Sequence, residues 1–496
     1  MKSIYSLIFL ILISLILYTF TFRGDWSNPS VNDIDLQHHR VGTAFETSQE
    51  GSRFAMIFSL INDKTLEIDK YAYMGTPDVG KINGHFYSLF PPAISIMAIP
   101  LYLLGFQLGA SQIFTFSLST IFAICTMILI WKFAIKLGLR WQAATFASLA
   151  FGFATNAWGY SVTLYAHLVS AFLVLSATYL TVYWQGKFSS LKIVLVWIIY
   201  SIASFVDYPN LFIFLPIVIY LTMNGISATS TGNKTSINIR PIFFIAPFIF
   251  IAFLVGYGYY NYHFFGSPLK LSNAIPRVTD INLPEETSNA AGGAESATSA
   301  LKTRYLLQGL NSFIVSIDRG ALVFSPIILL FVFGLGFLKN KLKNTETILI
   351  SVPAVCLLLY SMFGDPYGGW AFGSRYLIAI APELCLLAGI GLHRYWNKIL
   401  IKLLYSIVFI YSSSISLLAP LTTNVIPPYV EARNFGIDYT YIINWRMLND
   451  NNLNSYFYNN ILHGSISGLT YYSAILLFVS LIGLALIWMP KPKSQS

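Results

Sequence analysis

Apolar runs of about 17 residues or more recur along the whole chain and constrain its fold more than any other feature. Each run is long enough to cross the roughly 30 Å hydrocarbon core of a bilayer as a helix. The chain of 496 residues is 55% hydrophobic and only 10% charged, whereas a soluble chain carries roughly a quarter charged residues. We therefore predict an all-α polytopic membrane protein.

The apolar runs predict about 12 transmembrane helices, within a range of roughly 11 to 13. The predicted spans are residues 4–22, 111–131, 141–158, 162–184, 191–206, 210–223, 241–264, 320–338, 346–363, 376–392, 403–420 and 469–489. The apolar segment 92–109, which Pro100 interrupts, is predicted to be an interfacial or re-entrant helix. The alternative is that 92–109 spans the membrane and another segment does not.

The distribution of charge predicts the orientation of these helices. The loops on one side, such as 132–140 and 394–402, together with Lys2 and the tail, carry more than half of the Lys and Arg residues and one acid, Glu346. Because cytoplasmic loops are enriched in Lys and Arg, this side and the N-terminus are predicted to be cytoplasmic. The formal net charge of +9 then reflects membrane topology, and no nucleic-acid partner is expected.

A single transmembrane domain is predicted over residues 1–490, with a cytoplasmic tail at 491–496. Most candidate functional motifs lie in or beside the large outer loops at 23–110, 265–319 and 421–468. The inner loop 224–240 is rich in Ser, Thr and Asn and is predicted to be a linker. The three cysteines all lie in apolar runs, which indicates neither a disulfide framework nor a thiolate metal site.

Several short motifs follow one another through the outer segments. They are "EGSRFA" (50–55), "GHFYSLFPPAISIMAIP" (84–100), "AWGYSVTLYAH" (157–167), "DYPN" (207–210), "FGSPL" (265–269), "DRGALVFSP" (318–326) and "DPYGGWAFGSRYL" (365–377). In this order they resemble elements of the GT-C superfamily of membrane glycosyltransferases. The superfamily includes lipid A aminoarabinose transferases and protein O-mannosyltransferases, and the likeness is to its uncharacterised bacterial branch.

This resemblance implies a GT-C-like fold and an enzyme in a bacterial or archaeal cell membrane, with its active site on the outer face. Such an enzyme would transfer a sugar from a polyprenyl-phosphate-linked donor to an envelope acceptor. The resemblance places the general base at Glu50, and a carboxylate at that position can accept a proton from an acceptor hydroxyl. The reading of Glu50 as a simple acidic residue at a helix N-terminus stays open.

The chain departs from the superfamily pattern at two points. Glu50 lies about 27 residues beyond the first predicted span, and three carboxylates in the gap compete for its role: Asp25, Asp33 and Asp35. The Lys that usually precedes the two prolines, and that serves the lipid phosphate, is replaced by Phe90. Lys81, His85 or an arginine is expected to substitute for it, or donor binding differs; Arg53 is one of the residues predicted to bind the donor phosphate.

Further candidates come from the residue types in the motifs. Arg319 and Arg375 are predicted to bind the donor phosphate, because a guanidinium forms paired, charge-assisted hydrogen bonds with phosphate oxygens; Asp365 and Glu383 are possible partners of Arg375. Asp78 is predicted to orient the acceptor or support Arg53. The remaining predicted substrate-binding residues are Tyr87, His167, Asp207, Asp365 and Trp370. Each of these candidates also has a plainer interpretation without a role in binding. It can be a turn residue, a side chain that packs at the membrane interface, or a cation whose side chain reaches the lipid headgroups.

A polytopic transporter or a lipid or polysaccharide flippase is the alternative function, since intramembrane His and Glu also serve such proteins. No phosphate-binding loop of the GxxxxGK[ST] type is present, which favours a lipid-linked donor over a nucleotide sugar. No cofactor is firmly predicted; a divalent metal is possible with several outer carboxylates, but no ligand spacing indicates one.

Overall fold

The structure is a computed structural model that describes residues 2–38, 40–187, 189–231, 234–278, 302–336, 343–363, 368–462 and 465–490. The low-complexity stretch 285–300, the tail 491–496 and Asp365 lie outside the described residues.

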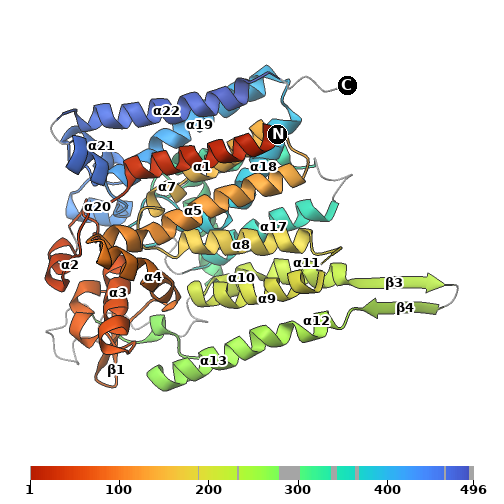
Figure 1. Cartoon of the computed structure of the whole chain (residues 1–496), viewed down its shortest axis with the longest axis horizontal. Coiled ribbons are helices and arrows are strands. Elements are labelled where there is room, and N and C mark those ends of the chain that lie inside the picture. Colours follow the sequence, from red (N-terminus) through yellow and green to blue (C-terminus); the bar gives the residue numbers. More distant parts are fainter. Residues whose placement is uncertain are drawn as a thin grey trace.

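Long apolar helices make up the body of the protein and run in roughly the same direction (Figure 1). Within the described part of the chain, seven segments are long and apolar enough to cross a membrane. They are α1 (Lys2–Thr21), α5 (Ser111–Lys136), α9 (Ser189–Val206), α12 with α13 (Ile242–Ile245 and Pro247–Phe265), η6 with α18 (Arg375–Ile380 and Ala381–Arg394), α19 (Ile399–Leu421) and α22 (Gly468–Trp488).

Shorter apolar helices complete this bundle. They are α4 (Ala93–Gln107), α6 (Trp141–Phe153), α7 (Ala157–Tyr160), α8 (His167–Val182), α10 (Asn210–Ile213), α11 (Leu215–Gly225) and α17 (Lys343–Ser361). Together with the long helices they cover all of the predicted spans except 320–338, and the prediction of an all-α polytopic membrane protein is confirmed. Helix α4, which covers most of 92–109, packs against α3 and α5.

The start of α1 and the end of α22 lie at one end of the bundle, and the large loops gather at the other end (Figure 1). The first loop contributes α2 (Val31–Gln37), α3 (Ser48–Phe58), η1 (Ser59–Asp63) and η2 (Asp69–Gly75). Later segments add η3 (Ser272–Ala274), η4 (Thr303–Tyr305), α15 (Leu306–Ile314), α20 (Tyr429–Phe435), α21 (Ile442–Asn449) and η7 (Tyr458–Leu462). Segments that are far apart in the sequence therefore meet at the end remote from the termini.

A small antiparallel sheet joins two of the loops. Its order is β2 (His85–Ser88), β1 (Val79–Ile82) and β5 (Arg277–Val278), with Val79 opposite both Ser88 and Val278. The turn between β1 and β2 is Asn83–Gly84, and both residues have a positive φ, as a two-residue hairpin turn requires. The sheet fixes the start of the loop 265–319 to the first loop.

Two predictions of local structure are wrong. The segment 224–240, which was expected to be linker-like, contains the hairpin of β3 (Ile226–Thr231) and β4 (Lys234–Ile239). Its Thr and Ile residues favour strands because β-branched side chains suit an extended backbone.

The predicted helical span 320–338 is instead broken into α16 (Ala321–Phe324) and the 3-10 helix η5 (Pro326–Gly334). Pro326 lies at the break, because proline cannot donate a backbone hydrogen bond to a continuing helix. Element η5 packs along α18, where a side chain at Gly334 would collide with the backbone carbonyl of Leu387. Small residues allow this close approach of two membrane segments.

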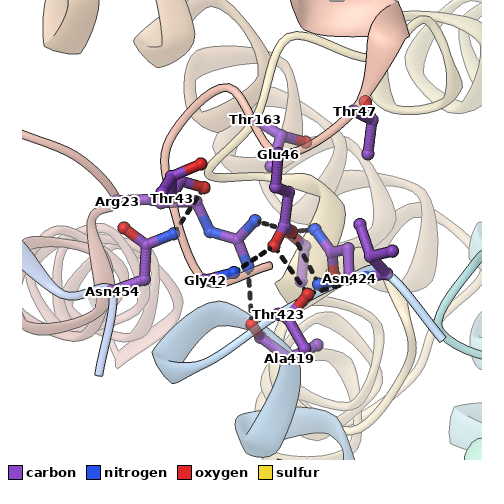
Figure 2. A network of polar contacts seen from close by, with 12 residues as sticks. Arg23, Gly42, Thr43, Glu46, Thr47, Thr163, Ala419, Thr423, Asn424 and Asn454 are labelled. Carbon is purple, nitrogen blue, oxygen red and sulfur yellow. Dashed lines mark hydrogen bonds and ion pairs between the residues drawn. The ribbon is translucent and has the colours of Figure 1, made fainter. Parts of the chain in front are cut away.

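A buried ion pair ties the first loop to the end of α1. The Arg23 guanidinium, just after α1, donates to the Glu46 carboxylate, and both side chains are fully buried (Figure 2). The second Nη of Arg23 donates to the carbonyl of Ala419, near the end of α19, at 2.8 Å. The pair therefore joins three segments that lie far apart in the sequence.

Three further donors complete the hydrogen bonding of Glu46. The backbone N–H of Gly42 donates at 2.9 Å, the hydroxyl of Thr423 at 2.6 Å and the backbone N–H of Asn424 at 2.8 Å (Figure 2). Asn424 in turn donates to the carbonyl of Gly159 at 2.9 Å. Burying a charged or polar group is costly unless it is paired and hydrogen-bonded, and these contacts satisfy both oxygens of the Glu46 side chain.

Glu46→Gln is expected to lower the free energy of unfolding by about 3–5 kcal/mol, because it leaves the buried Arg23 without its counter-charge. The measurement is thermal or denaturant unfolding in detergent.

The matched control is Asp438→Asn, which removes the half-exposed partner of Arg446 at the same end of the molecule. Breaking such an exposed pair should cost about 0.2–1 kcal/mol. Equal losses for the two variants would contradict the importance assigned to Glu46.

Candidate active site

A cavity of about 1750 Å³ opens at the end of the bundle where the loops gather. Besides Thr47 and Tyr165, its wall contains the acidic and basic side chains of Glu46, Arg53, Asp78, His167, Asp207, Arg277 and Arg375. Another part of the wall is apolar and comes largely from α13, including Ile251, Leu254, Val255, Tyr259 and Tyr262. These α13 side chains are also exposed, on a segment that is long and apolar enough to cross a membrane. The cavity thus combines a charged region with an apolar region formed by a candidate membrane span.

Helix α3 carries the predicted general base, Glu50, which is fully buried. The sequence Thr47–x–x–Glu50 is typical of a capping box, in which the Thr side chain accepts a hydrogen bond from the helix backbone. Thr47 is indeed the N-cap residue, but its side chain makes no capping hydrogen bond. Its hydroxyl donates to the Glu50 carboxylate instead. The contact between Thr47 and Glu50 is therefore not a capping box.

One oxygen of the Glu50 carboxylate, Oε1, is buried and has no hydrogen-bond partner among the described residues. Burial raises the pKa of Glu50 to about 8, and the negative charge of Glu46 adds to this effect. Arg23 and Arg53 act in the opposite direction. Glu50 therefore has a pKa close to neutral pH, as a general base requires. Glu50 is not one of the described residues that line the cavity, whereas Thr47 is.

Sequence reasoning missed Glu46 and its partner Arg23. Glu46 precedes Glu50 by four residues, and the ordered motifs drew attention only to the second carboxylate. No local pattern marks Glu46, because its hydrogen-bond donors come from residues as distant as Thr423 and Asn424.

The other carboxylates considered for the role of Glu50 lie elsewhere. Asp25, Asp33 and Asp35 are exposed, and Asp33 belongs to a capping box with Ser30 at the start of α2. None of the three is among the described residues that line the cavity.

Arg53, one turn after Glu50, faces the cavity. One Nη donates to the carbonyl of Leu164 at 2.7 Å, while its Nε has no hydrogen-bond partner among the described residues. The ring of Phe90 lies 4.5 Å from the guanidinium carbon, and the ring of Tyr165 lies 5.8 Å from it. Phe90, the residue before the two prolines, therefore stacks on a cation that faces the cavity.

Arg375 faces the same region from the glycine-rich segment before α18. Its guanidinium carbon is 6.0 Å from the ring of Tyr165, on which Arg53 also packs, and its Nε has no hydrogen-bond partner among the described residues. Gly368, Gly369 and Gly373 all have a positive φ, and a side chain at Gly373 would collide with Asn156. The glycines thus permit the irregular backbone that brings Arg375 to the cavity.

The guanidinium of Arg319 makes different contacts from that of Arg375. Arg319 is fully buried, and its guanidinium donates to the carbonyls of Asp318, Gly369 and Ile426. Arg319 is also not among the described residues that line the cavity. Its contacts hold the glycine-rich segment in place.

The remaining predicted residues fall into two groups. Asp78, His167, Asp207 and Trp370 line the cavity. Burial raises the pKa of Asp207 to about 6, against the lowering effect of Arg53 and Arg375. Lys81, His85 and Tyr87 lie on the β1–β2 hairpin and are not among the described lining residues.

Two predicted ion pairs are replaced by other contacts. Asp78 pairs with Arg277 at 3.4 Å rather than with Arg53, and it also accepts a hydrogen bond from Ser48. Glu383 accepts a hydrogen bond from Thr178 on α8 at 3.5 Å rather than pairing with Arg375. In both cases the observed partner is far away in the sequence, so spacing along the chain could not reveal it.

Within the described part of the chain, one group of side chains has the arrangement of a possible metal site: Glu67, Asp69 and His85. One ligand atom from each lies within 4.8 Å of the others. His85 Nδ1 is 2.8 Å from Asp69, and this hydrogen bond and the charge of Glu67 raise the pKa of His85. The group is at the hairpin rather than at the cavity, so a bound ion would stabilise the loop.

No protein-family model matches the chain, and no curated protein matches it at a significant level. Among solved structures, ArnT from Cupriavidus metallidurans in the apo state matches with a TM-score of 0.50 and 12% identity, over 98% of this chain and 77% of that chain. ArnT bound to undecaprenyl phosphate has a TM-score of 0.49 and 13% identity, over 97% and 76% of the two chains.

The archaeal oligosaccharyltransferase AglB from Archaeoglobus fulgidus, in complex with an inhibitory peptide and a dolichol-phosphate, has a TM-score of 0.48 and 12% identity, over 86% of this chain and 56% of that chain. The likeness to apo ArnT extends over almost the whole chain. The protein therefore has the GT-C fold that its ordered motifs predict.

Proposed function

We propose that this protein is a membrane glycosyltransferase that moves a sugar from a polyprenyl-phosphate-linked donor to a hydroxyl group of an envelope acceptor, a glycan, lipid or protein, on the outer face of the membrane. The observation that carries the proposal is the position of Glu50. A buried carboxylate with an unpartnered oxygen lies behind the wall of a cavity that contains the guanidinium groups of Arg53 and Arg375 and an apolar region formed by a candidate membrane span.

The two regions of the cavity suit the two parts of such a donor. An isoprenoid chain would lie along the apolar α13 wall, and its phosphate would reach Arg53 and Arg375 beside Tyr165. Guanidinium groups bind phosphate oxygens strongly through charge-assisted hydrogen bonds. They also stabilise the negative charge that develops on the phosphate when it leaves.

In the transfer step, the oxygen of the acceptor hydroxyl forms a bond with the anomeric carbon, and the bond from that carbon to the phosphate oxygen breaks. The acceptor proton goes to Glu50, and the polyprenyl phosphate leaves with the bonding electron pair. Asp78 and Trp370 line the cavity and are proposed to orient the acceptor or the sugar, together with His167 and Asp207. Arg319 and the hairpin residues Lys81, His85 and Tyr87 are proposed to support this arrangement from outside the cavity.

Glu50→Gln should reduce sugar transfer by about 10²–10⁴-fold, because an amide cannot accept the acceptor proton. The measurement is transfer of radiolabelled sugar from polyprenyl-phosphate glucose, mannose or arabinose to envelope extract by the purified protein. A transporter or flippase would keep most of its activity in this variant. Full transfer by Glu50→Gln would therefore exclude the proposed role of Glu50.

The rate of transfer should also depend on pH. Glu50 acts as a base only when ionised, so with a pKa of about 8 the rate should rise by about tenfold per pH unit below pH 8 and level off above it. The charged and titratable groups around Glu50 are Glu46, Arg23, Arg53, Tyr160 and Tyr165. A flat rate between pH 6 and 9 would contradict the assignment.

Arg375→Ala should raise the donor KM by roughly 10–150-fold, which corresponds to the loss of about 1.5–3 kcal/mol for a hydrogen bond to a charged group. Arg53→Lys should have a smaller effect, because it keeps the charge but loses the planar donor pair. The matched control is Arg304→Ala, an exposed arginine that is not among the described lining residues. An unchanged donor KM in Arg375→Ala would argue against phosphate binding at this position.

A further inference from the structure

A continuous row of three oxygen atoms leads from Glu50 to the cavity. The Thr47 hydroxyl donates to the Glu50 carboxylate, and the Tyr165 hydroxyl lies 3.1 Å from the Thr47 hydroxyl. Glu50 is not among the described residues that line the cavity, whereas Thr47 and Tyr165 both are. A substrate in the cavity therefore meets these hydroxyl groups before it meets the carboxylate.

The hydrogen bonds in this row have a defined direction. When Glu50 is ionised, as a base must be, its carboxylate can only accept, so the single proton of the Thr47 hydroxyl is committed to Glu50. The contact between Tyr165 and Thr47 must then use the proton of Tyr165, with the oxygen of Thr47 as acceptor. The tyrosine oxygen keeps its capacity to accept a hydrogen bond from the cavity side. Every bond in the row thus points toward Glu50.

The surroundings of Tyr165 hold its ring in place. The ring is stacked on His167, with centroids 5.8 Å apart, and makes an edge contact with Tyr160 at 5.1 Å. The guanidinium groups of Arg53 and Arg375 also pack on it. A hydroxyl fixed in this way between two cations lies where the donor phosphate is proposed to bind, and so close to the reacting carbon.

We propose that Tyr165 and Thr47 relay the acceptor proton to Glu50. This inference rests on the proposed transferase function and adds two catalytic residues to it. As the acceptor oxygen attacks the anomeric carbon, its proton passes to the Tyr165 oxygen, the Tyr165 proton passes to the Thr47 oxygen, and the Thr47 proton passes to Glu50. Three O–H bonds break and three form, and both hydroxyl groups end the step neutral.

The relay explains why Thr47 does not cap α3. A capping hydrogen bond would require the Thr47 oxygen to accept from a backbone N–H of the first helical turn. That oxygen accepts from Tyr165 instead, and the local cost of an uncapped helix is of the order of 1 kcal/mol. The Thr47 hydroxyl therefore makes no capping hydrogen bond and instead connects Glu50 with the cavity.

The test compares Thr47→Val, Thr47→Ser and Tyr165→Phe with wild type and Glu50→Gln. The assay is single-turnover transfer from radiolabelled polyprenyl-phosphate sugars at saturating donor. Thr47→Val and Tyr165→Phe should each lower the transfer rate by about 100-fold or more, in the range of general-base catalysis, with the donor KM unchanged. Thr47→Ser retains the hydroxyl and should stay within about fivefold of wild type. Thermal unfolding establishes that each variant is folded.

The outcomes separate the relay from the function on which it rests. If Glu50→Gln is inactive while Thr47→Val or Tyr165→Phe keeps the wild-type rate, the relay is wrong and the general base stands. If Thr47→Ser is as slow as Thr47→Val, the effect comes from packing and the relay is wrong as well. If wild type transfers no sugar from any of the three donors, the proposed function fails and the relay fails with it.

Discussion

The buried ion pair between Arg23 and Glu46 is the interaction on which the arrangement of the loops depends. It connects the end of α1, the segment that leads into α3 and the residues that follow α19. A charge at this depth is tolerated only when its partner and hydrogen bonds are all present. Because Glu46 lies just before α3, the pair also fixes the start of the helix that carries Glu50.

Two carboxylates four residues apart thus have opposite environments. Glu46 accepts four hydrogen bonds and faces an arginine, whereas Glu50 accepts one from a hydroxyl and has an unpartnered oxygen. The burial and the unpartnered oxygen of Glu50 favour proton uptake by that residue. Two arginines also have different environments: Arg319 donates hydrogen bonds to backbone carbonyls, whereas Arg375 faces the cavity.

The fold could be predicted from the sequence to a large extent, because membrane helices are encoded locally by long apolar runs. The errors occurred where local composition was ambiguous, as in the hairpin at 226–239, or where Pro326 interrupts an apolar run. The ordered motifs led to Glu50, Arg53 and Arg375, and to the GT-C fold. They did not indicate Arg23 or Glu46. They also suggested contacts for Asp78 and Glu383 that differ from the contacts in the structure.

The sequence by itself determined where most of the membrane helices form and which residue types the loops contain. The tertiary structure alone decided the partners of these charged and polar groups. Thr423 and Asn424 donate hydrogen bonds to Glu46 from almost 380 residues away, and Tyr165 reaches Thr47 from another helix connection. The physical reason is that hydropathy is a property of contiguous residues, whereas protonation depends on the few groups within hydrogen-bonding distance, which the fold brings together from distant segments.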